Sequence, residues 1–129
     1  MEKPAKTDYP IHEFLSRRWS PRAFSSQRVE PEKLKSLFEA ARWAPSSNND
    51  QPWHFLVATQ DNPEEFQRLL SCLKEGNIRW VKQAPVLLIS VTRLNFEDDN
   101  EPNRHAFHDI GLAVANLTVQ AMTMGLFVH

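Results

Sequence analysis

The stretch "AARWAPSSNNDQPWHF", residues 40–55, begins as the end of a helix and finishes as the start of a strand. Between them lies a run of prolines, serines and amides, residues 45–52, which we call the polar loop. Proline and asparagine are typical turn residues, but a chain reversal needs only one or two of them. The excess of hydroxyl and amide side chains indicates that this loop does more than reverse the chain.

The segments on either side of the polar loop have clear periodicities. A helix is predicted to begin at Pro31, because proline suits a first helical turn, and to stop at Pro45. Its apolar stripe consists of Leu34, Leu37, Phe38 and Ala41. The sequence "WHFLVAT", residues 53–59, predicts a strand. Asn62, Pro63 and Glu65 form a helix start, and the inner face of that helix is predicted to carry Phe66, Leu69, Leu70 and Leu73.

The second half of the chain predicts one more strand and a long helix. "APVLLISVT", residues 84–92, is a continuous apolar run of the kind found in strands buried on both faces. A helix from about Asn103 to Met124, ended by Gly125, is apolar nearly all round and is expected to be central. A short helix is predicted near residues 11–18. The pattern indicates an α+β or α/β fold in a single domain, residues 1–129, with helices packed around a small sheet.

Composition restricts the classes of function. The net charge of −1 argues against a surface that binds nucleic acid over the whole molecule. The lone Cys72, whose neighbours predict a packed thiol, fits a reducing compartment, and the N-terminus lacks the apolar stretch of a secretory signal, so a cytoplasmic location is expected. Residues 110–129 contain no Asp, Glu, Lys or Arg, but Asn116 and Gln120 interrupt them, so burial within protein is expected rather than a membrane span.

A basic segment, "SRRWSPRAF" at residues 16–24, precedes the first long helix. Pro21 ends any helix there, and an extended chain sends alternate side chains to the same side. Arg18, Ser20 and Arg22 could therefore converge on one ligand, since two guanidinium groups and a hydroxyl suit a phosphate monoester. From the residues alone, anion binding and a structural role remain equally open.

Together, "RWSPRAF" and "APSSNNDQPWHF" resemble the flavin-dependent nitroreductase family of FMN-dependent NAD(P)H oxidoreductases. "GNIRWVKQAPVLL" at 76–88 and "HDIGLAVANLTVQAMTMGL" at 108–126 agree in order and spacing. The resemblance therefore extends from Ile11 onward and implies a nitroreductase-like α+β fold. Family members continue beyond the segment matching "MGLFVH", so the chain is expected to be the N-terminal portion of that fold, incomplete at its C-terminal end.

The resemblance implies an FMN site shared between two subunits of a homodimer, with a seam on the 104–124 helix. Arg18, Ser20 and Arg22 are expected to contact the phosphate, ribityl chain and pyrimidine edge of FMN. The segment of Pro45, Ser46, Ser47 and Asn49, with Gln51 as a further candidate, is expected to reach the flavin of the other subunit. Asn77 matches a residue that bonds the pyrimidine edge, whereas Trp19 stands where the family often has another basic residue. Asn48 and Asp50 are expected only to satisfy the turn through their side chains.

The implied reaction is a ping-pong cycle in which NAD(P)H reduces the flavin, and a nitroaromatic, quinone or similar acceptor then reoxidises it. No protein nucleophile or base is required, so no catalytic side chain is expected. The alternative is a truncated, non-catalytic remnant that at most dimerises or holds flavin weakly. His105 and His108, followed by Asp109, have the spacing of a partial metal site, but two imidazoles on one face with no further ligand do not predict a metal.

Overall fold

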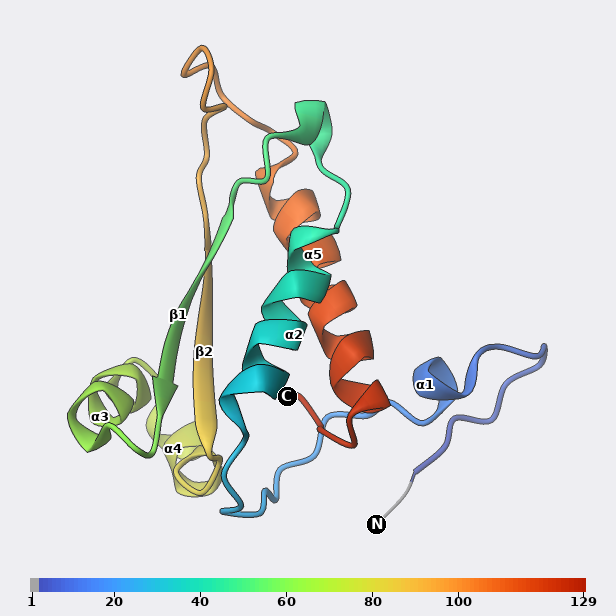
Figure 1. The fold of residues 1–129 in the computed structure, drawn as a ribbon, viewed down its shortest axis with the longest axis vertical. Coiled ribbons are helices and arrows are strands. Elements are labelled where there is room, and N and C mark those ends of the chain that lie inside the picture. The colour runs from blue at the N-terminus through green and yellow to red at the C-terminus, as the bar shows by residue number, and fades with distance from the viewer. Residues whose placement is uncertain (1–2) are drawn as a thin grey trace.

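The computed structural model describes residues 3–129. Its elements follow in the order α1 (Glu13–Ser16), α2 (Pro31–Arg42), the 3-10 helix η1 (Ser47–Asn49), β1 (Trp53–Thr59), α3 (Pro63–Ser71), α4 (Glu75–Val81), β2 (Val86–Thr92) and α5 (Ala106–Thr123). Figure 1 shows α2 and α5 side by side along one face of the β1–β2 ribbon, with α3 and α4 near the opposite end of the ribbon from η1. The fold is α+β, as predicted.

The α2–α5 pair forms the main core. Ala113 and Ala121 of α5 are fully buried, and Leu117 is 2% exposed, so the two helices approach closely over small side chains. Their partners in the cluster include Leu37 and Ala41 of α2. Burial of this apolar surface is the main stabilising contribution to such a pair.

Polar side chains of α5 join the two helices at the rim of this core. Asn116 Nδ2 donates to the Ala40 carbonyl oxygen (3.2 Å), and Gln120 Nε2 donates to Ser36 Oγ (3.0 Å). These bonds account for the amides that interrupt the apolar C-terminal segment. Within residues 3–129, no helix has the length and hydropathy needed to cross a membrane.

The sheet is a two-stranded antiparallel ribbon in which Trp53 pairs with Thr92 and Thr59 pairs with Val86. Trp53 and Phe55 face the α2–α5 core, as expected for alternating side chains. A second cluster forms on the other face, where Phe66 and Leu70 of α3 pack with Ala58. The predicted α3 start is confirmed, because Asn62 Oδ1 accepts the Glu65 N–H (3.4 Å) and Pro63 is the first helical residue.

Several predictions about burial are wrong. β2 is not buried on both faces: none of its residues is fully buried, and Val91 is 40% exposed, because the sheet has only two strands and α3 covers part of one face. Only one stripe of α5 is buried, and Phe107 on its outer side is 74% exposed. Cys72 is exposed because it lies at the C-terminal cap of α3.

Two element boundaries also differ from prediction, and one element was not predicted. The short helix predicted near residues 11–18 is only four residues long, and Ile11 and Leu15 are exposed. α5 begins at Ala106 rather than Asn103, because the Asn103 side chain accepts the His105 N–H (2.9 Å) and forms a turn. α4 was not predicted, and its start lacks a side-chain cap that could have indicated it. Gly125 does end α5 in the left-handed conformation, with φ of 69°.

We expect Ala113→Leu to destabilise the protein by roughly 1–3 kcal/mol, because the larger side chain must be forced between α2 and α5. Ala115→Leu is the matched control, since Ala115 lies on the exposed side of the same helix. Urea unfolding followed by circular dichroism measures both variants. Equal unfolding midpoints for the two would contradict the packing described for α5.

Candidate functional site

The polar loop has an unusual backbone. Asn48, Asn49 and Gln51 have φ values of 54°, 55° and 48°, in the left-handed region that non-glycine residues seldom occupy. Ser46 Oγ accepts the Gln51 N–H (3.0 Å), and Gln51 Nε2 donates to Asn49 Oδ1 (3.0 Å). The side chains of Asn49 and Gln51 therefore lie together on the outside of a tight, internally bonded turn. Both of these residues are exposed.

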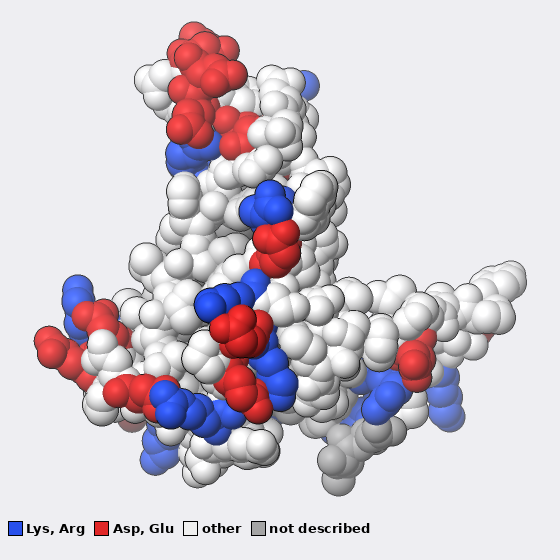
Figure 2. Space-filling model, in the orientation of Figure 1, with Lys and Arg blue, Asp and Glu red and all other residues white. Residues whose placement is uncertain are grey.

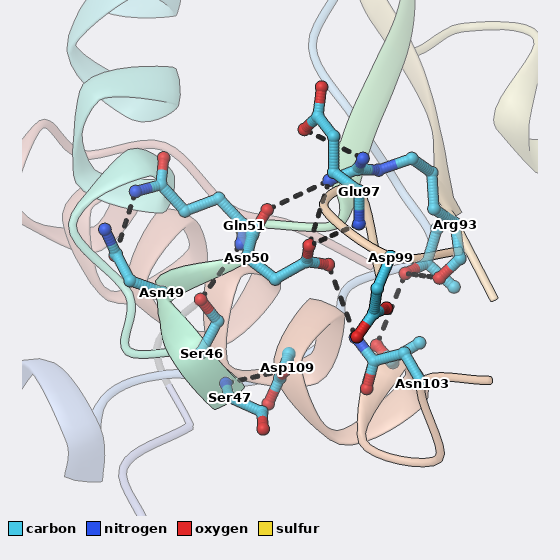
Figure 3. A network of polar contacts seen from close by, with 12 residues as sticks. Ser46, Ser47, Asn49, Asp50, Gln51, Arg93, Glu97, Asp99, Asn103 and Asp109 are labelled. Atoms are coloured by element: carbon cyan, nitrogen blue, oxygen red, sulfur yellow. Dashed lines mark hydrogen bonds and ion pairs between the residues drawn. The ribbon is translucent and has the colours of Figure 1, made fainter. Parts of the chain in front are cut away.

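Both ends of this turn are held by residues distant in the sequence (Figure 3). The Ser47 N–H donates to Asp109 Oδ2 (3.0 Å), and the Asp109 side chain is almost completely buried in the first turn of α5. Asp50 does not serve the turn as predicted. Its carboxylate accepts the Glu97 N–H (3.0 Å) and Asn103 Nδ2 (3.4 Å), so it attaches the polar loop to the 93–103 loop.

Arg93 completes the contact between the two loops. Its Nη2 donates to the Asp50 carbonyl oxygen (3.0 Å) and lies 3.5 Å from Asp50 Oδ1, while its Nη1 pairs with Glu97 Oε2 (2.8 Å). Arg93 was not predicted as a site residue, and Asp109 was considered only as part of a metal site. No local pattern could have indicated either contact, because the bonded residues are 43 and 62 positions apart.

After α1, the basic segment continues without helix or strand. Arg18 Nη1 donates to Ser20 Oγ (3.4 Å), so the side chains at these two alternate positions meet on one side. Arg18, Ser20 and Arg22 are exposed, whereas Pro21 is buried. Within residues 3–129, neither Arg18 nor Arg22 forms an ion pair. The segment thus offers positive charge and a hydroxyl to solvent, as a phosphate group requires.

Aromatic contacts fix the position of the basic segment. Trp19 packs edge-on against Phe127, with 6.3 Å between the ring centroids, so its ring contributes to the packing of the fold. Phe24 stacks on Trp80 of α4 at 6.2 Å. Asn77 is exposed on α4, one turn before Trp80, which places it on the element against which the basic segment packs.

The predicted site residues form two groups. The polar loop, which includes the exposed Pro45, contacts Asp109 at the N-terminal end of α5. The basic segment contacts Phe127, just beyond the C-terminal end of α5. An 18-residue helix is about 27 Å long, so the structure does not bring the two groups together within one chain (Figure 1).

Charge is distributed unevenly over the surface. Figure 2 shows acidic side chains gathered at the tip of the 93–103 loop, where Glu97, Asp98, Asp99 and Glu101 are exposed. Along α2, opposite charges alternate and pair with each other. Hydrogen bonds from Arg42 and from the Trp43 indole lower the pKa of Glu39 to about 2, so the last turn of α2 keeps this exposed ion pair at neutral pH.

The other kinds of site to consider in the described part of the chain are metal sites and hollows on the surface. Residues 3–129 contain no group of three His, Cys, Asp or Glu side chains that could hold a metal ion. His108 Nδ1 instead lies 3.2 Å from Asp109 Oδ1. A hollow of about 440 Å³ on the 93–100 segment and one of about 250 Å³ beside residues 26–29 include none of the predicted flavin-contacting residues.

Solved structures resemble this fold closely. A crystal structure of an oxidoreductase containing FMN superposes with a TM-score of 0.87 and 35% sequence identity, covering 94% of this chain and 62% of that protein. An FMN-dependent nitroreductase from Clostridium difficile R20291 superposes with a TM-score of 0.70 and 31% identity, covering 87% of this chain and 60% of its own.

Sequence comparison finds relatives among curated proteins as well. Mouse iodotyrosine deiodinase 1 is 26% identical over 128 aligned residues, which cover 81% of this chain and 45% of the relative. The chain thus spans less than half the length of that relative and about three fifths of the solved structures. Residues 15–79, half of the chain, match the Nitroreductase family. On this match, and on the shared fold, the protein is a member of the Nitroreductase family.

Proposed function

We propose that this protein binds FMN and, with a second copy of itself, transfers hydride from NAD(P)H to a nitroaromatic, quinone or similar acceptor. The observation that carries the proposal is the pair of guanidinium groups, Arg18 and Arg22, which are exposed and have no carboxylate partner within residues 3–129. In a protein whose carboxylates and basic residues are nearly equal in number, such unneutralised cations are available to an anionic ligand.

The proposed phosphate contacts are Arg18 and Ser20. Their 3.4 Å contact supports this assignment, because it places both side chains on one side of the chain, and the buried Pro21 restricts the backbone between Ser20 and Arg22. Charge-assisted bonds of this kind are stronger than neutral ones and compensate the desolvation of a phosphate. Arg22 and Asn77 are assigned to the pyrimidine edge, where the Arg22 cation would favour the negative charge that reduction adds.

Ser46, Ser47, Asn49 and Gln51, with Pro45, are assigned to the flavin of the second subunit. The separation of the polar loop from the basic segment by the length of α5 supports this assignment, because one chain cannot place both groups around one flavin. A two-fold symmetric pair would bring each polar loop to the partner's basic segment and form two equivalent sites. The exposed outer side of α5, which includes Phe107, is available for the seam between subunits.

The chemistry divides between the cofactor and the protein. FMN, when bound, supplies a ring that accepts and donates hydride. The residues of this chain bind and orient it, and none of them is assigned a nucleophilic or proton-transferring role. NAD(P)H and the acceptor would use the same site in turn.

The direct test is to purify the protein, identify its cofactor by chromatography and follow NADH and NADPH oxidation with a nitroaromatic or a quinone. We expect FMN rather than FAD, because the arginine pair suits a terminal phosphate and the sequence has no Gly-x-Gly-x-x-Gly loop for a dinucleotide. Bound FAD would refute the cofactor assignment. Bound FMN without oxidation of either nucleotide would instead favour a flavin-binding protein that does not turn over.

We expect Arg18→Ala to weaken FMN binding by roughly 1.5–3 kcal/mol, or tenfold or more in Kd, because it removes a charge-assisted bond. Arg22→Ala should also lower the reduction potential of the bound flavin, since it removes a cation from the ring edge. Arg68→Ala is the control, because Arg68 is an exposed cation on α3 that pairs only with Glu65 among the described residues. Flavin fluorescence titration and dye-coupled potentiometry give the two readouts, and wild-type values in both arginine variants would exclude the assigned roles.

A further inference from the structure

The backbone of the polar loop is held in a conformation that its residues do not favour. Three of its residues have left-handed φ values, and for Gln51, at 48°, no local side-chain preference compensates the strain. Residues in such conformations persist when the surrounding structure over-determines them, and they cluster where ligands bind. The groups that hold the loop from outside are therefore of functional interest.

The first external contact is the carboxylate of Asp109. Ser46 occupies the cap position of η1, but its hydroxyl accepts the Gln51 N–H, so it does not cap the helix. The N–H of Ser47, the first residue of η1, donates instead to Asp109 Oδ2, at 3.0 Å. The other oxygen, Oδ1, lies 3.2 Å from Nδ1 of the exposed His108. A residue 62 positions away thus fixes the start of the turn.

The second contact with a distant segment is made by the loop's own Asp50, whose side chain is 6% exposed. It accepts from the Glu97 N–H and Asn103 Nδ2, and Arg93 donates to its backbone carbonyl oxygen. These bonds fix the end of the turn against the 93–103 loop. Burying a carboxylate is costly unless its oxygens are bonded, so two buried carboxylates at the ends of one turn, one from the turn and one from α5, are informative.

We propose that Asp109 and Asp50 are positioning residues of the flavin site, which hold residues 46–51 in the conformation that presents Asn49 and Gln51 to the cofactor. Neither carboxylate contacts the ligand in this arrangement, since both are buried and used by protein donors. The inference rests on the proposed FMN function and adds to it the residues that determine the geometry of the polar loop.

The test compares Asp109→Ala, Asp109→Asn and Asp50→Asn with two controls. Asp98→Asn removes one negative charge, as the variants at Asp109 and Asp50 do, but from the tip of the 93–103 loop. The Asp98 side chain forms no hydrogen bond or ion pair among the described residues. Leu70→Ala destabilises the second core cluster, remote from the polar loop. For each protein, we would measure the FMN Kd, the visible circular dichroism of bound flavin at saturation, and the exchange protection of the Ser47 amide without FMN.

We expect Asp109→Ala and Asp50→Asn to raise the FMN Kd about tenfold and to change the visible circular dichroism, because the loop donors no longer face the ring in one orientation. Asp109→Asn keeps an acceptor oxygen and should show a smaller effect. Among the variants at Asp109, Asp98 and Leu70, only Asp109→Ala should lose the exchange protection of the Ser47 amide. Neither control should alter the flavin spectrum, although Leu70→Ala lowers stability.

Two results would overturn the inference while leaving the proposed function intact. One is a wild-type Kd and flavin spectrum in Asp109→Ala and Asp50→Asn, even with Ser47 protection lost, which would make the contacts structural only. The other is an equal spectral change in Leu70→Ala, which would attribute the effect to stability. If Asp109→Ala does not fold, the same criteria apply to Asp50→Asn and Asp109→Asn. Failure of the wild-type protein to bind FMN would reject the proposed function itself, and this inference with it.

Discussion

The close packing of α2 on α5 is the constraint on which the other features depend. Ala113 and Ala121 are fully buried at this contact, and a larger side chain at either position would separate the helices. The Asn116 and Gln120 amides bond to α2 at the rim and fix the relative position of the helices along their length. Because α2 leads into the polar loop and α5 begins beside it, this packing also places Asp109 against Ser47.

The same packing separates the two groups of predicted ligand-binding residues. The polar loop lies at one end of α5 and the basic segment at the other, where Trp19 contacts Phe127 and Pro21 contacts His129. A ligand that needs donors from both groups must receive them from two chains. The proposed shared flavin site is therefore a consequence of the helix pair's length and of its antiparallel direction.

Polar contacts in this protein specify conformation rather than add much stability. The exposed ion pairs along α2 contribute little, because water screens them. The carboxylates of Asp109 and Asp50 are different, since they are buried and each accepts a hydrogen bond from a distant segment. Such fully bonded buried groups select one loop geometry among several, and removing one partner leaves the other unsatisfied.

The sequence by itself determined the helices and strands with strong local signals, and the chemical types available to a ligand. Pro31, Asn62 with Pro63, and Gly125 mark element ends through backbone restrictions that act within a few residues. The contact between the Arg18 and Ser20 side chains agrees with the prediction that alternate side chains point to the same side of the chain. α4 was missed because its start has no capping side chain.

Only the tertiary structure decided which surfaces are buried and which distant residues meet. The exposure of β2 depends on the number of strands and on where α3 packs, and an apolar run gives no information on either. Asp50 resembles any turn aspartate in sequence, yet its partners come from residues 93–103 because the ribbon and α5 bring that loop to it. Local patterns report the preferences of neighbouring residues, whereas contacts across 43 to 62 positions exist only once the helices have packed.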